Sequence, residues 1–162
     1  MATRVEDLYD EDFYAWAMDQ ADALRRLADL RPNTGIDVAH LVEAVEDLAR
    51  AERNAVRSQL RRLLEHCLKL EHSPAVDPRA GWKASIDDAR HEIADRLTPT
   101  LRSHVEHDLP ALYVQARRVA AKALAAASER AAADALPPAN PYHLADLLTD
   151  DWYPTGTHDV AV

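Results

Sequence analysis

The sequence predicts an all-α protein, a bundle of four to six helices with one long central helix. Three observations support this fold class. Only 3 of the 162 residues are glycine and 1 is phenylalanine, whereas alanine, the strongest helix former, recurs along the chain. Apolar residues repeat with the 3.6-residue period of a helix. Prolines separate the periodic segments, at Pro32, Pro74, Pro99, Pro110 and Pro137.

The length of 162 residues favours one domain, residues 1–162, with a tail at 155–162 that we expect to be frayed. The net charge of −9 disfavours binding to nucleic acid or to an anionic membrane surface. No apolar segment is long enough to span a bilayer, and the N-terminus lacks the apolar run of a signal peptide. We therefore expect a cytoplasmic protein.

The first two helices are bounded by capping and turn residues. A helix is expected to begin at Asp10, whose carboxylate can cap the first turn, and to end before Pro32. Asp37 is expected to cap a second helix, which has no breaker before Ser73-Pro74. This helix carries an apolar stripe and, in its C-terminal half, a second apolar face. The stripe contains Leu41, Val45, Leu48, Val56, Leu63 and Leu70, and the second leucine face contains Leu60, Leu64 and Leu68.

Further helical segments are expected in the second half of the chain. The apolar face of the third helix contains Trp82, Ile86, Ala89, Ile93 and Leu97. Thr98-Pro99 is a cap followed by a first-turn proline, and it begins a helix that Pro110 kinks or restarts. An alanine-rich helix follows and stops before Pro137-Pro138. A short helix over 141–148 comes next, and Trp152-Tyr153-Pro154 is expected to fold back onto the bundle.

Glu52, Gln59 and His66 are the most informative polar residues, because they recur every seven residues within the apolar stripe of the second helix. An isolated buried charge costs several kcal/mol, so Glu52 needs a partner. Arg90 on the third helix is the predicted partner, and Gln20 on the first helix is another candidate. These five residues form a candidate polar core or pocket. Two interpretations stay open: a polar layer that sets helix register, and a functional pocket.

Patterns typical of metal sites and of catalysis are missing from the sequence. A dimetal carboxylate bundle requires Glu-x-x-His pairs, whereas the chain has the reverse order at His40-x-x-Glu43. The three glycines are too far apart to form a phosphate-binding loop. Cys67 is the single cysteine and is interpreted as a small core residue. We therefore expect no metal, no cofactor and no catalytic residues, and the balance is against an enzyme.

Several segments resemble the bacterial "domain of unknown function 29" family, over about residues 7–154. The matching segments are Tyr9–Trp16 near the start, Leu41–Arg53 and Leu63–Lys69 in the second helix, Gly81–Ile86 in the third helix, and Pro141–Leu144 with Trp152–Pro154 at the close. The resemblance implies a small all-helical bacterial protein with no established activity.

These observations favour a non-catalytic helical bundle that acts through protein–protein interaction or self-association. The second leucine face is surplus to the apolar stripe, so a homo-oligomer, most simply a dimer, or an unknown protein partner is expected to cover it. The alternative is a ligand-binding or enzymatic bundle with an interior polar pocket around Glu52, His66 and Arg90. A dimer without metal would favour the first hypothesis, and a monomer with stoichiometric metal would favour the second.

Overall fold

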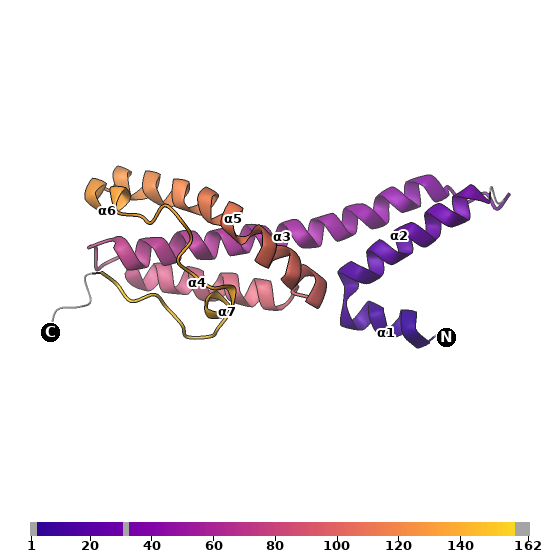
Figure 1. Cartoon of the computed structure of the whole chain (residues 1–162), viewed down its shortest axis with the longest axis horizontal. Helices are drawn as coiled ribbons and strands as arrows, with labels where there is room; N and C mark the ends of the chain where they lie inside the picture. Colours follow the sequence, from indigo (N-terminus) through magenta and orange to yellow (C-terminus); the bar gives the residue numbers. More distant parts are fainter. Residues whose placement is uncertain (1–2, 31–32, 158–162) are drawn as a thin grey trace. The chain divides into compact units, whose positions relative to one another are not determined.

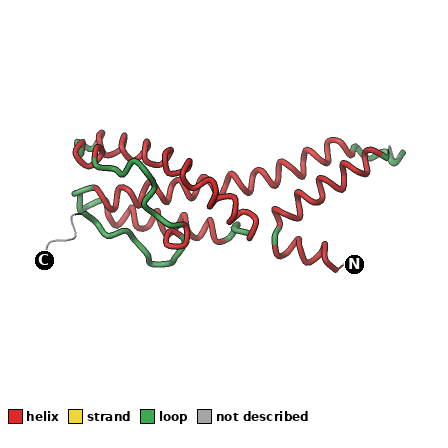
Figure 2. The backbone as a smooth tube through the Cα atoms, viewed as in Figure 1, coloured by secondary structure: helices red, strands yellow, loops and turns green. Residues whose placement is uncertain are grey.

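The computed structural model describes residues 3–30 and 33–157, and within these residues every regular element is a helix (Figure 1). Turns and loops connect the helices (Figure 2). The predicted all-α fold class is therefore confirmed. The helices are α1 (Thr3–Glu11), α2 (Phe13–Asp29), α3 (Val38–His72), α4 (Arg79–Ala94), α5 (Pro99–Ala126), α6 (Arg130–Asp134) and α7 (Leu144–Leu147).

The chain forms two compact units. The first unit contains Met1–Ala55 and Leu97–His104, and the second contains Val56–Arg96 and Val105–Val162. The long helices α3 and α5 contribute residues to both units. The single domain expected from the chain length stays a prediction.

The first unit begins with one more helix than the sequence predicted. Asp12, and not the predicted Asp10, is the N-cap of α2, and its carboxylate accepts a hydrogen bond from the Ala15 amide at 2.9 Å. Its other oxygen accepts from the amide of Thr100 in the first turn of α5, at 2.8 Å. Burial raises the pKa of Asp12, but the hydrogen bonds from these two amides, together with those from the Thr100 and Thr98 side chains, outweigh burial and hold its pKa below the ordinary value. Asp12 thus joins α2 to the start of α5.

Helices α2 and α3 of the first unit pack through small side chains. The buried residues are Ala17 and Ala21 of α2 and Val38, Val42 and Ala49 of α3. Alanines at a contact let two helices approach closely. An ion pair between Arg25 and Glu46 also joins the two helices. The predicted cap of α3 is confirmed, because Asp37 accepts a hydrogen bond from the His40 amide at 3.2 Å.

The second leucine face of α3 is buried inside the second unit. Leu60, Leu64 and Leu68 are each no more than 1% exposed. Figure 1 shows α4 and α5 on different sides of this half of α3, which explains why two apolar faces are needed there. The expectation that this row is surplus and is left for a second copy is therefore wrong.

Helix α5 begins as predicted and ends earlier than predicted. The Thr98 hydroxyl oxygen accepts a hydrogen bond from the Leu101 amide at 3.2 Å, which confirms the predicted cap. The helix continues through Pro110 and does not restart there. It ends because Ser128 adopts a left-handed conformation with φ of 66°, and the short helix α6 follows.

The C-terminal segment folds back onto the second unit, as the sequence predicted. Thr157 donates hydrogen bonds from its amide, at 2.8 Å, and from its hydroxyl, at 3.0 Å, to the carbonyl of Glu71 near the end of α3. Thr157, within the predicted frayed tail, is therefore attached to α3, and residues 158–162 lie outside the described residues. Helix α7 is shorter than the predicted segment 141–148.

Candidate functional site

Arg90 is buried in the second unit, with only 4% of its surface exposed. Its Nε donates to the Leu147 carbonyl at 2.8 Å, its Nη2 donates to the Trp152 carbonyl, and its Nη1 donates to Asp87 Oδ1 at 3.2 Å. Glu52 belongs to the first unit and Arg90 to the second, so the predicted pairing of these two residues stays a prediction. The C-terminal segment supplies carbonyl acceptors outside regular helix, and helical periodicity does not reveal them.

Tyr153 completes the cluster around Arg90. Its hydroxyl donates to the Asp87 carboxylate, with distances of 2.8 and 2.7 Å to the two oxygens. Two cations lie over its ring, Lys83 Nζ at 4.9 Å and Arg90 Cζ at 5.4 Å from the centroid. Burial and the bonded Asp87 carboxylate raise the pKa of Tyr153 to about 12. The cluster is therefore a clamp that holds the segment after α7 against α4, and we call it the Arg90 clamp.

A second polar contact attaches the same C-terminal segment to α3. The Tyr142 hydroxyl donates to the Glu71 carboxylate at 2.5 Å. Burial, and then the bonded carboxylate, raise the pKa of this phenol. Cys67, one turn before Glu71, is fully buried, and burial raises the pKa of its thiol to about 12. The interpretation of Cys67 as a small core residue is confirmed, since such a thiol is inert.

The other four predicted site residues are half-buried and belong to different units. Gln20 and Glu52 lie in the first unit, and Gln59 and His66 lie in the second. Gln59 Oε1 and His66 Nδ1 are buried atoms without a hydrogen-bond partner among the described residues. Burial lowers the pKa of His66. Within the described part of the second unit, no hydrogen bond joins Arg90 to either residue, so Arg90 forms a clamp and the role of the other four stays a prediction.

Two classes of feature are missing from residues 3–30 and 33–157. No three side chains of His, Cys, Asp or Glu are grouped so that they could hold a metal ion. No helix in this part of the chain has the length and apolar character that crossing a membrane requires.

The first unit exposes leucines that the sequence placed in the core. Leu41 and Leu48 of α3 are 43% and 56% exposed, and Leu27 of α2 is 42% exposed. The prediction of a buried stripe is wrong for Leu41 and Leu48. Helix α3 instead turns the row that contains Val42 and Ala49 toward the unit's interior, because the alanines of α2 leave room for a close approach.

These leucines lie on one side of the α2–α3 pair. Leu48 precedes the buried Ala49 by about 100° of helical rotation, and Leu27 is displaced by a similar angle in the same sense from the buried Ala17 and Ala21. The two helices run antiparallel (Figure 1), so the same rotation brings both rows to the same side. We call this surface the hairpin face; it contains Leu27, Leu41, Leu48 and, between the last two, the exposed Ala44.

An aromatic cluster extends the hairpin face along α2. Trp16 and Leu27 are eleven residues apart, about three turns, and so lie on the same side of the helix. Trp16 stacks on Phe13 with 5.6 Å between ring centroids, and Tyr9 of α1 meets Trp16 edge-on at 4.8 Å. Tyr9 is 50% exposed. Aromatic residues of this kind are enriched at protein–protein interfaces.

Comparisons with known proteins agree with this architecture. The chain is similar to an alpha-helical protein of unknown function from Rhodospirillum rubrum, whose crystal structure superimposes with a TM-score of 0.77. The two chains are 24% identical, and the match covers 89% of this chain and 90% of the other, so the likeness shows the fold. No curated protein matches the chain. Residues 8–153 match the family described as "Domain of unknown function DUF29", and the chain therefore belongs to the DUF29 family.

Proposed function

We propose that this protein is a non-catalytic helical protein that acts through self-association, with two copies joined at the hairpin face. The observation that carries the proposal is the exposure of Leu27, Leu41 and Leu48 on one side of the α2–α3 pair. Leucines two turns apart with an alanine between them have the spacing of the seam along which two helices pack, with the side chains of one helix inserted between those of the other. The single cysteine, which cannot form a disulfide framework within the chain, favours a cytoplasmic location for the assembly.

A second copy is the occupant that this surface fits best. Two antiparallel helices can bury only the faces they turn toward each other, whereas two such pairs related by a two-fold axis make a four-helix bundle. In that arrangement each leucine row meets the same row of the other copy, so the apolar areas match without a further partner. The carboxylate of Asp37, just before α3, is paired with His40 at 2.5 Å, and that of Asp47 within α3 is paired with Arg50 at 2.7 Å, so neither would enter the interface as an isolated charge.

The experiment is a measurement of mass in solution. Sedimentation equilibrium at tens of micromolar protein is expected to give twice the chain mass of 18.1 kDa for the wild type. Leu41→Glu combined with Leu48→Glu places two carboxylates in the seam, and we expect this variant to sediment as a monomer with unchanged helical circular dichroism.

The matched control changes two exposed apolar residues of the second unit. Val114 and Val119 of α5 are 53% and 44% exposed, so Val114→Glu combined with Val119→Glu adds the same charge at comparable exposure. We expect this control to remain a dimer. A monomeric wild type, or equal dissociation of both variants, would refute the proposal.

A further inference from the structure

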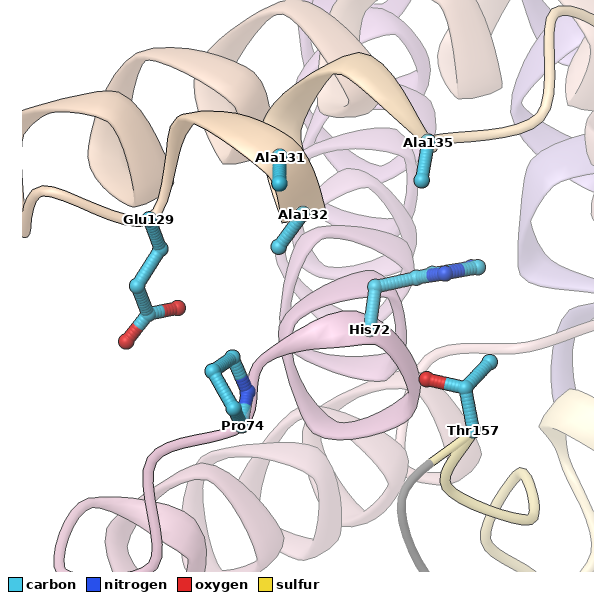
Figure 3. A pocket seen from close by; sticks show the side chains of 7 residues that line it. All are labelled: His72, Pro74, Glu129, Ala131, Ala132, Ala135 and Thr157. Carbon is cyan, nitrogen blue, oxygen red and sulfur yellow. The ribbon is translucent and has the colours of Figure 1, made fainter.

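The second unit contains a cavity of about 310 Å³ where the end of α3, the region of α6 and Thr157 meet (Figure 3). Its polar side chains are His72, Glu129 and Thr157, and the rest of its lining is Pro74 and three alanines between residues 131 and 135. The volume is at the lower end of the range of small-molecule sites, about 300–1,000 Å³. None of these residues belongs to the hairpin face or to the Arg90 clamp.

The backbone directs Glu129 toward this cavity. Ser128 adopts a left-handed conformation, with φ of 66°, which is unfavourable for a residue other than glycine. The turn is closed by the Glu129 amide, which donates to the Leu124 carbonyl at 2.9 Å. Figure 3 shows the Glu129 side chain extending from this turn toward Pro74, with its carboxylate on the cavity side. The local structure thus holds a carboxylate beside a wall of methyl groups.

The hydrogen-bonding capacity of this carboxylate is incompletely used. Glu129 Oε2 is buried and has no hydrogen-bond partner among the described residues. Thr157, one of the residues that line the cavity with Glu129, has its amide and hydroxyl both bonded to the Glu71 carbonyl. A buried carboxylate oxygen without a donor is unfavourable, so a ligand that brings a donor gains a strong, charge-assisted hydrogen bond.

We propose that this cavity binds a small primary amine. The ammonium group donates to the Glu129 carboxylate, and a short alkyl chain packs against Pro74, Ala131 and Ala132. The Glu129 carboxylate disfavours an anion in the cavity, because like charges repel each other. The lining also disfavours a large polar molecule, because the alanines and the proline offer no side-chain partner for further polar groups.

The test compares three probes of the same length and different charge. We titrate the ¹⁵N-labelled full chain with n-butylammonium chloride, n-butanol and sodium butyrate at constant ionic strength and follow the amide resonances. Butylammonium is expected to shift the amides of Ala131, Ala132 and Thr157 with a dissociation constant on the order of 1 mM. Butanol is expected to bind roughly ten-fold more weakly, and butyrate is expected to leave these amides unchanged.

Two variants and one control assign the effect to the cavity. Glu129→Gln keeps the size of the side chain and removes its charge, so we expect butylammonium to lose its advantage over butanol. Ala132→Leu fills the cavity and is expected to abolish both shifts. Asp134→Asn removes an exposed carboxylate of α6 and is expected to change neither the butylammonium shifts nor the butanol shifts.

The proposal is overturned if butyrate and butylammonium shift the same amides equally, or if none of the three probes shifts them at concentrations of tens of millimolar. It is also overturned if the preference for butylammonium survives Glu129→Gln. The comparison of probes on the wild type decides the question even where a variant does not fold.

Discussion

The two units bury their leucines differently, although the same helix runs through both. In the second unit, Leu63 and Leu64 of α3 are fully buried. In the first unit, Leu41 and Leu48 lie two turns apart on the same helix and are both exposed. Alanines and valines make the contact with α2 instead. The apolar period of α3 is the same throughout. The difference shows that the number of neighbouring elements, and not the periodicity, decides whether a leucine is covered.

The polar interactions of the two units follow the same division. In the second unit the side chain of Arg90 is buried, and carbonyls of the C-terminal segment accept hydrogen bonds from its guanidinium. The first unit uses the short side chain of Asp12 as a cap that also binds the Thr100 amide. The buried side chain of Arg90 therefore stabilises the second unit. The first unit is stabilised by the helix cap Asp12 and, in our proposal, by a second copy that covers the hairpin face.

The largest effect is expected from Arg90→Ala. This change leaves the carbonyls of Leu147 and Trp152 without their donor and opens a space at a side chain that is 4% exposed. We expect the free energy of unfolding to fall by about 3–5 kcal/mol, measured by urea denaturation. Arg118→Ala, at an exposed position of α5, is the control and is expected to change stability by less than about 0.5 kcal/mol. A loss below about 1 kcal/mol for Arg90→Ala would show that the clamp is not what holds the segment.

A pair of leucine substitutions tests the contrast between the units directly. Leu64→Ala leaves a cavity in the second unit, and we expect it to cost about 2–5 kcal/mol at every protein concentration. Leu48→Ala removes a side chain that is 56% exposed in one copy, so its cost is expected only at concentrations where the dimer forms and to vanish on dilution. Urea denaturation at low and high protein concentration distinguishes the two cases. A large, concentration-independent loss for Leu48→Ala would mean that its own chain covers it.

A smaller effect is expected from Asp12→Ala, which removes the cap of α2 and the acceptor of the Thr100 amide. We expect a loss of about 1–2 kcal/mol at neutral pH. Because the folded pKa of Asp12 lies below its ordinary value of 3.8, its contribution is complete above about pH 4 and is lost as the pH falls through the folded pKa.

The measurement is urea denaturation as a function of pH between about pH 5 and pH 2. The wild type is expected to lose more stability over this range than Asp12→Ala does. Asp10→Ala removes the residue that the sequence proposed as the cap, and it should behave like the wild type. Parallel curves for all three proteins would contradict the role of Asp12.

Local signals accounted for most of the fold. The second helix was expected from Asp37 to Ser73-Pro74 and is observed at Val38–His72. Asp37 and Thr98 both act as the predicted caps. Each of these features depends on residues within about four positions of one another. The wrong cap at Asp10 has the same origin. Asp10 and Asp12 are acidic residues two positions apart and give similar local signals for a helix cap, and only the contact of Asp12 with Thr100 distinguishes them.

The candidate site was less predictable. Arg90 was identified as a residue within or beside the core, but its acceptors are carbonyls 57 and 62 residues later in the chain. Asp87 and Tyr153 were not identified as its companions. The aromatic residues near the C-terminus were the only available signal, and they indicated that the segment folds back without indicating what it contacts.

The sequence by itself determined that the chain is helical and where its long helix begins and ends, and it placed Arg90 within or beside the core. Only the tertiary structure decided which apolar row of α3 faces its neighbours, which carbonyls satisfy Arg90, and that Thr157 is bound to the end of α3. The physical reason is the distance along the sequence over which each kind of interaction acts. Capping and helical periodicity arise within a few residues, whereas burial and the partners of buried polar groups depend on elements that are distant in the sequence and adjacent in the fold.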